Sequence, residues 1–227
     1  MLFNPMYFLY IAPAVLLGLW AQFRIKVAYA QAEQMAAPLS GAAAARHILD
    51  SAGLNGVQIE EIPGQLSDHY DPRDNVLRLS EAVYRSRTLA AVGIAAHEAG
   101  HAMQHAQAYA PMLVRNAAVP AAGIGSNAGI MLIILGAIFN MHMMLWLGIG
   151  LFSCVVFFQL VNLPVEFNAS SRAKAQLVSL GIINSDELVY VNKVLNAAAL
   201  TYVAATLQAV LTLLYYIMRF SGGRDRD

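Results

Sequence analysis

Residues 116–165 read NAAVPAAGIGSNAGIMLIILGAIFNMHMMLWLGIGLFSCVVFFQLVNLPV, and this run contains no Asp, Glu, Lys or Arg. A transmembrane helix needs about 20 apolar residues, so about 50 uncharged residues are enough for two crossings of a membrane. Asn140, Met141 and His142 interrupt the apolar run near its middle and mark a turn. We therefore predict two transmembrane helices over residues 116–163.

Two further uncharged runs lie toward the ends of the sequence, at residues 1–23 and 194–218, and each is long enough for one crossing. The first has no charged n-region and its apolar stretch is longer than that of a signal peptide, so we expect a retained anchor. Four spans agree with a composition of 58% hydrophobic and 12% charged residues, because soluble domains carry about a quarter charged residues. The sequence therefore predicts a mainly α integral membrane protein with about four transmembrane helices.

Most of the charged side chains lie in residues 24–115, which we expect to form a domain outside the membrane. Ser40 is placed to cap a helix that Gly53 ends. Alternating apolar residues at 57–62 and 76–79 predict two short strands. The block therefore predicts a small α+β domain.

Three further local features complete this block. Residues 68–75 are polar and indicate a turn-rich loop, and Ser80 after the second strand is a suitable N-cap. From Thr88 to about Ala106 the sequence is apolar except for a few polar side chains, and predicts a buried helix.

The two transmembrane helices predicted over residues 116–163 form a helical hairpin. After it, Asn162 and Pro164 suit the start of another helix, which carries Glu166. We assign this helical segment to residues 164–193. Asp186 and Glu187 suit the N-terminus of a helix that leads into the last span, because acidic side chains are favourable there. Residues 219–227 form a tail.

The predicted buried helix contains His97-Glu98-Ala99-Gly100-His101. Residues four apart lie on one face of a helix, so both imidazoles can bind one metal ion. Glu98 is placed beside the pair, where a carboxylate can act as general base. Two nitrogens and a carboxylate oxygen suit Zn²⁺ with a fourth position left open. A chance HExxH is the alternative, but an apolar helix with two histidines beside a glutamate favours a metal.

The third ligand is not on the same helix. Eight residues rise about 12 Å, so His105 cannot reach the ion that His97 binds. We expect His105 to be structural or to contact the metal ligands without binding the metal. Gln104 and Gln107 stand where the metzincin motif needs Gly and His, which excludes that pattern. We predict Glu166 as the third ligand, because two crossings return the chain to the side of the first two. Its alternative is an acid in a first helical turn that satisfies the helix dipole.

Several side chains are candidates for stabilising the oxyanion of the transition state. His69 or Tyr70, in the polar cluster of residues 68–73, could supply this group, and the strand after them could pair with an extended peptide. Arg172 is a rival. The alternative for the cluster is a solvated turn.

Several motifs, in order, resemble one known family, the YugP-like membrane neutral zinc metallopeptidases: residues 66–73 (LSDHYDPR), 92–104 (VGIAAHEAGHAMQ), 164–170 (PVEFNAS) and 194–202 (VLNAAALTY). More distantly the chain is similar to the HtpX and CAAX-prenyl endopeptidase group of gluzincins. The likeness covers nearly the whole sequence.

The resemblance implies a minigluzincin-like core, in which an edge strand covers the cleft. It also implies His97, His101 and Glu166 as zinc ligands and Glu98 as the base. Two positions depart from these patterns. Ser170 stands where the distant relatives often have aspartate, and Asn168 stands where the YugP-like pattern has it.

The predicted function is a zinc-dependent endopeptidase that acts on membrane-associated or misfolded proteins. The alternative is a non-catalytic membrane scaffold or partner-binding protein that keeps a zinc site. A structural site normally has four protein ligands, and only three are found, which favours catalysis. Partners are then a protein or peptide substrate and membrane lipid, with other membrane proteins or a second copy of the chain left open. A net charge of zero without basic runs argues against nucleic acid.

The distribution of Lys and Arg predicts that the domain faces the cytoplasm of a multi-pass cell-membrane protein. Basic residues lie next to the spans on the domain's side, whereas residues 140–144 have no charge. These basic residues are Arg24, Lys26, Arg115, Arg172, Lys174 and Lys193. The basic side chains of the tail, Arg219, Arg224 and Arg226, favour the opposite orientation.

Overall fold

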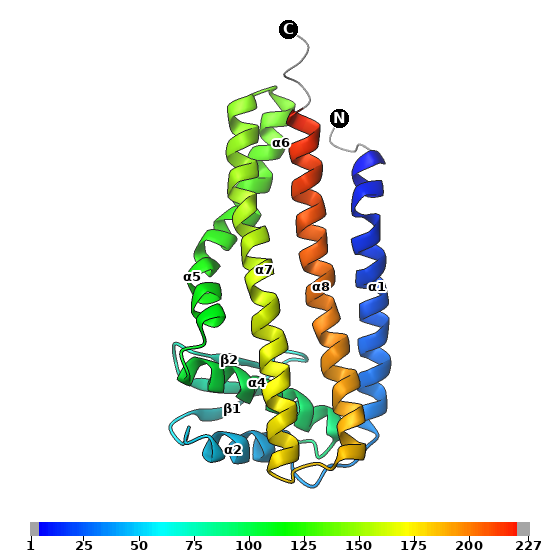
Figure 1. Ribbon diagram of the computed structural model, residues 1–227, viewed down its shortest axis with the longest axis vertical. Helices are drawn as coiled ribbons and strands as arrows, with labels where there is room; N and C mark the ends of the chain where they lie inside the picture. The colour runs from blue at the N-terminus through cyan, green and yellow to red at the C-terminus, as the bar shows by residue number, and fades with distance from the viewer. Residues whose placement is uncertain (1–4, 222–227) are drawn as a thin grey trace. The chain divides into compact units, whose positions relative to one another are not determined.

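The long uncharged runs form long helices in the computed structural model, which describes residues 5–221 (Figure 1). Within these residues four helical stretches are long and apolar enough to cross a membrane, which confirms the prediction of about four membrane-length helices. They are α1 (Pro5–Glu33), the stretch Ala110–Ile138, α7 (His142–Ser179) and α8 (Ser185–Ser221). The second stretch consists of α5 (Ala110–Ile124), the π-helical turn η1 (Gly125–Gly129) and α6 (Ile130–Ile138). Residues 1–4 of the predicted anchor and residues 222–227 of the predicted tail, which include Arg224 and Arg226, lie outside the described residues.

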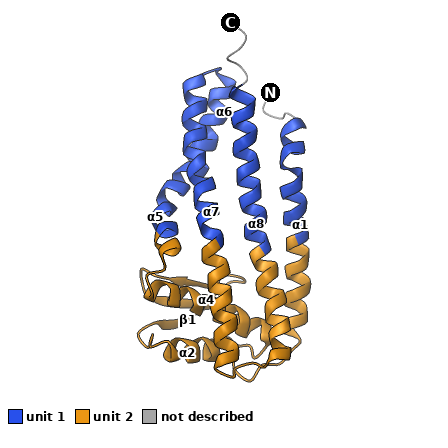
Figure 2. Ribbon diagram, in the orientation of Figure 1, with its two compact units in different colours: residues 1–20, 114–163, 200–227 blue, residues 21–113, 164–199 orange. Residues whose placement is uncertain are grey.

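The chain divides into two compact units (Figure 2). Unit 1 consists of Met1–Trp20, Val114–Leu163 and Leu200–Asp227, and unit 2 consists of Ala21–Leu113 and Pro164–Ala199. Each unit has its own apolar core. The core of unit 1 is formed by α6, α7 and α8 and contains Ile133, Leu145, Ile149, Phe152, Val156 and Ala209.

In unit 1 the predicted hairpin turns at Asn140, whose φ is 52°. Its two arms pack closely because glycines face each other: a Cβ on Gly148 would lie 2.7 Å from the carbonyl oxygen of Gly129. Small residues let helices in membranes approach in this way.

Unit 2 contains a three-stranded sheet of β1 (Gln58–Ile62), β2 (His69–Asp71) and β3 (Val76–Ser80) in the order β1-β3-β2. The central strand β3 is parallel to β1 and antiparallel to β2. The two predicted strands are confirmed, but residues 68–75 are not all loop, because β2 lies within them. Polar residues concealed this strand: Asp71 is buried, and Arg73 and Arg78 both donate hydrogen bonds to its carboxylate.

The short helices of unit 2 are α2 (Gly41–Ser51), α3 (Glu81–Arg85) and α4 (Leu89–Ala106). Ser40 caps α2 as predicted, and Thr88 caps α4, since both hydroxyls accept from backbone N–H groups at 3.3 Å. Ser80 makes no such cap bond, because its hydroxyl donates to Asp68 instead. Helix α2 packs on α4, and α4 also contacts β2 and β3 (Figure 1).

Helix α7 corrects the predicted helix start at Asn162 and Pro164, because it is continuous from His142 to Ser179 with Pro164 inside it. Proline removes one helical N–H donor, but membrane helices tolerate this when neighbouring groups satisfy the freed backbone. The predicted segments 164–193 and 194–218 are therefore parts of α7 and α8. The predicted position of Asp186 and Glu187 in the first turn of α8 is confirmed.

Candidate metal centre

Helix α4 presents His97 and His101 on one face. Their rings are one helical turn apart, with centroids separated by 4.8 Å. Gly100 between them allows the backbone of α7 to come close, since a Cβ there would lie 2.6 Å from the carbonyl oxygen of Ala169. Helix α7 thus packs directly on α4 beside the two histidines.

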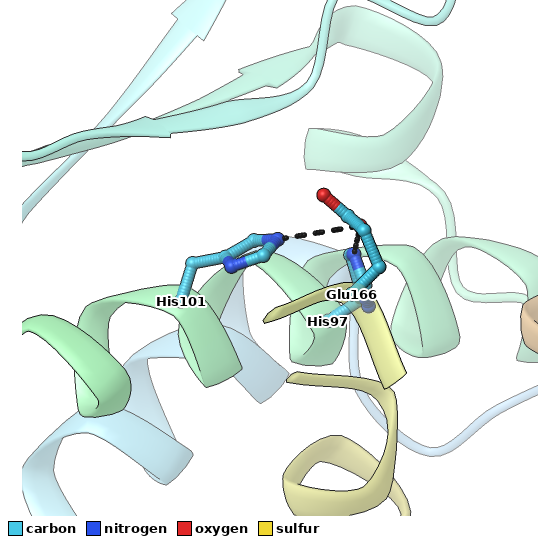
Figure 3. A group of neighbouring side chains, drawn as sticks. All are labelled: His97, His101 and Glu166. Carbon is cyan, nitrogen blue, oxygen red and sulfur yellow. Dashed lines mark ion pairs between the residues drawn. The ribbon is translucent and has the colours of Figure 1, made fainter. Parts of the chain in front are cut away.

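Glu166 points from α7 toward both imidazoles (Figure 3). Its Oε2 lies 3.3 Å from Nε2 of His97 and 3.7 Å from Nε2 of His101. One ligand atom from each residue lies within 4.8 Å of the others. The structure therefore brings together the three residues that the sequence suggested as metal ligands. Glu166 does not lie in a first helical turn, so its alternative as an N-terminal helix acid does not apply.

The donor set fits zinc. Oε2 of Glu166 is buried and accepts no hydrogen bond, although two ring nitrogens lie within 4 Å. A buried carboxylate oxygen without a donor is costly unless a cation is supplied. Tetrahedral ligands at about 2.0–2.1 Å from zinc lie about 3.3 Å apart, close to the separations found here.

Each histidine is oriented by a neutral side chain on its second nitrogen. Nδ1 of His101 lies 3.0 Å from Oε1 of Gln104, and Nδ1 of His97 lies 3.1 Å from the Ser170 hydroxyl. Ser170, which stands where the distant relatives often have aspartate, is thus the partner of His97. Sequence reasoning missed Gln104 as a neighbour of His101. The available signal was its position three residues further along the same face of an apolar helix.

Glu98 lies next to strand β2. Its Oε2 accepts a hydrogen bond from the backbone N–H of Tyr70 at 3.2 Å. Burial raises the pKa of the Glu98 carboxyl above its ordinary value, while His97 and His101 act in the opposite direction. A raised pKa suits a group that must take up and release a proton near neutral pH.

The three oxyanion candidates differ in their surroundings. His69 is exposed on β2, with Nδ1 2.7 Å from the carbonyl oxygen of Ser67. The Tyr70 hydroxyl donates to Asn75 at 2.9 Å and also contacts Nδ1 of His105 at 2.8 Å.

Arg172 donates to Asn168 and Gln107, both at 2.7 Å. These bonds hold its Nε and one terminal nitrogen of the guanidinium. The structure thus shows His105 in a hydrogen bond with the neighbouring strand, and shows Arg172 in a network that joins α7 to the C-terminal end of α4.

Among residues 5–221, four membrane-length helices and a largely buried His–His–Glu group define a helical membrane protein with a site suited to zinc. The chain belongs to the family described as "Putative neutral zinc metallopeptidase", which matches residues 7–221 and confirms the predicted family and its Zn²⁺. It is similar to "Putative membrane protease YugP" of Bacillus subtilis (strain 168), with 45% identity over 225 residues. That alignment covers 98% of this chain and 100% of the relative. No solved structure matches the chain.

Proposed function

We propose that the protein is a membrane-embedded zinc endopeptidase of the HExxH gluzincin type, which hydrolyses peptide bonds of membrane-associated or misfolded proteins. The observation that carries this proposal is the convergence of His97, His101 and Glu166 around a buried carboxylate oxygen that has no hydrogen-bond donor. The family and its membrane-protease relative support the same reaction class.

In this proposal His97 and His101 bind zinc through Nε2, and Glu166 binds it through its carboxylate. When bound, zinc supplies Lewis acidity and makes water a nucleophile at neutral pH. The remaining chemistry belongs to side chains of the protein. Three protein ligands leave one coordination position for catalysis.

Glu98 is the proposed general base. The N–H of Tyr70 holds Oε2 of Glu98 at 3.2 Å, so Oε1 is the oxygen we assign to proton transfer. Oε1 takes a proton from the attacking water and then gives it to the leaving amine nitrogen. The raised pKa of this carboxyl supports both halves of the transfer.

His69 is the proposed oxyanion-stabilising group, and Arg172 is its rival. His69 is exposed and precedes the residue whose N–H contacts Glu98, which places it on the strand beside the base. Arg172 has two of its donor positions occupied by Asn168 and Gln107. His69→Ala should lower kcat by about 100-fold, whereas a larger effect of Arg172→Ala on kcat would reverse the assignment.

The test of the function compares Glu98→Gln with Glu166→Ala in detergent-purified full-length protein. Zinc content is measured by elemental analysis, and turnover with an unfolded protein substrate. Wild type should contain about one zinc per chain and cleave the substrate. Glu98→Gln should keep the zinc and lose turnover, and Glu166→Ala should lose both.

Circular dichroism of both variants controls for folding. A well-folded Glu166→Ala protein with full zinc and turnover would contradict the ligand assignment. Wild-type zinc without any hydrolysis would instead favour the scaffold alternative.

A further inference from the structure

Gln104 is a fully buried side chain whose amide nitrogen and amide oxygen both take part in hydrogen bonds. Its Nε2 donates to the carbonyl oxygen of Val165 at 2.8 Å and to Oδ1 of Asn168 at 3.0 Å. Its Oε1 lies 3.0 Å from Nδ1 of His101. The side chain is 0% exposed, so no water replaces these partners. One glutamine thus joins a histidine of the metal centre to helix α7.

The direction of the hydrogen bonds around Gln104 is fixed by chemistry. A guanidinium can only donate, so the Asn168 atom 2.7 Å from Nε of Arg172 must be the oxygen. That oxygen and the Val165 carbonyl can only accept, so both must face the NH₂ group of Gln104. The carbonyl oxygen of Gln104 then faces His101, and Nδ1 of His101 must carry the hydrogen.

A histidine protonated on Nδ1 has a lone pair on Nε2, the nitrogen that lies 3.7 Å from Oε2 of Glu166. The same amide is bonded to the carbonyl of Val165, the residue before Glu166. Gln104 therefore acts on two of the three residues of the metal centre. Gln104 fixes the tautomer of His101, and it holds the backbone that carries Glu166.

We propose that Gln104 is a positioning residue for zinc, which sets the Nδ1–H tautomer of His101 and fastens the Glu166 turn of α7 to α4. Arg172 and Asn168 set the direction of this hydrogen-bond chain. The inference rests on the proposed zinc peptidase function and extends it to residues that do not contact the metal.

The test is Gln104→Met in the full-length protein in detergent. Methionine keeps the length and much of the volume of glutamine, but it cannot donate to Val165 and Asn168, and its thioether is only a weak acceptor for His101. Zinc affinity, measured by competition with a chelating dye, should fall by about 10- to 100-fold, as for other groups that orient metal ligands. The turnover of Gln104→Met should be closer to the wild-type value at saturating zinc than at limiting zinc.

Gln31→Met is the matched control, because Gln31 is an exposed glutamine of unit 2 whose Oε1 accepts from Nζ of Lys193 at 3.5 Å. It should leave zinc affinity unchanged. A purely structural role of Gln104 would lower the melting temperature of the metal-free protein and leave zinc affinity at the control value. That result would overturn the inference.

If Gln104→Met does not fold, Asn168→Ala takes its place, because it removes the oxygen that orients the amide. A loss of zinc affinity smaller than the one expected for Gln104→Met supports the inference, and an unchanged affinity overturns it. Wild type that binds zinc without hydrolysing peptides would refute only the proposed function. Wild type that binds no zinc would refute both.

Discussion

Gly100 lies where α4 approaches the backbone of α7, next to the metal centre. A Cβ at this position would lie 2.6 Å from the carbonyl oxygen of Ala169. Backbone cannot move as a flexible side chain can, so Gly100→Ala should destabilise the fold by about 1–3 kcal/mol. It should also weaken zinc binding, because it pushes Glu166 away from the histidines.

Gly150→Ala in α7 is the control for Gly100→Ala. A Cβ there meets nothing within 4 Å, so alanine should be neutral or stabilise by up to about 1 kcal/mol. Thermal melting and zinc titration measure both variants. Equal melting temperatures and zinc affinities would show that α7 does not pack on α4 as described.

Asp71 provides a pH-dependent contribution to stability. Hydrogen bonds from Arg73, with a further one from Arg78, hold the pKa of its carboxyl well below the ordinary value. Because the pKa of Asp71 is lower in the folded state than in the unfolded state, its carboxylate stabilises the protein at pH values above the unfolded pKa of about 3.9. This stabilisation is lost as the pH falls through the folded-state pKa.

Asp71→Asn should therefore melt at a lower temperature than wild type at pH 7. The difference should stay constant down to about pH 4 and shrink below it. Melting curves in detergent between pH 3 and 7, at about one-unit steps, measure it. A difference that grows on acidification would contradict the assignment.

At the scale of elements, strand β2 is held to α4 at two points through one residue. The N–H of Tyr70 bonds to Glu98, and the Tyr70 hydroxyl contacts His105 two turns further along the same helix. Tyr70→Phe removes only the second contact and the bond to Asn75. It should cost about 0.5–1.5 kcal/mol, because the Tyr70 hydroxyl loses its hydrogen bonds to the exposed Asn75 and the half-buried His105.

Hydrogen exchange measures this effect locally. Backbone amides of residues 69–71 should exchange faster in Tyr70→Phe, while zinc content stays at the wild-type value. Tyr84→Phe on α3 is the matched control, since Tyr84 is half-buried in the same unit. Unchanged exchange at β2 would mean that the hydroxyl does not hold the strand.

At the scale of the whole molecule, the basic residues predict the orientation in the membrane. Lys and Arg near the spans predict a cytoplasmic unit 2. In a Cys154→Ala background, Gln65→Cys, at an exposed loop position of unit 2, should react with an impermeant thiol reagent only after cells are permeabilised. Met143→Cys, at the uncharged end of the hairpin, should react in intact cells. The reverse labelling pattern would place unit 2 outside.

The sequence by itself determined the features that depend on neighbouring residues. Uncharged length predicts a membrane helix, and the spacing of His97 and His101 places two imidazoles on one helix face. Caps at Ser40 and Thr88 are equally local, because a hydroxyl reaches an N–H only three residues away. The choice of Glu166 required one non-local step, the counting of two crossings.

Only the tertiary structure decided the features that depend on packing between distant segments. Strand β2 exists because β3 supplies its hydrogen bonds, and Asp71 is buried because two arginines neutralise it. Pro164 was expected to begin a helix, yet α7 continues through it. Gln104 meets Val165, 61 residues away, and no periodicity in the sequence encodes that contact. Spacing along a helix fixes which side chains share a face, whereas their partners are set by the helix that packs against that face.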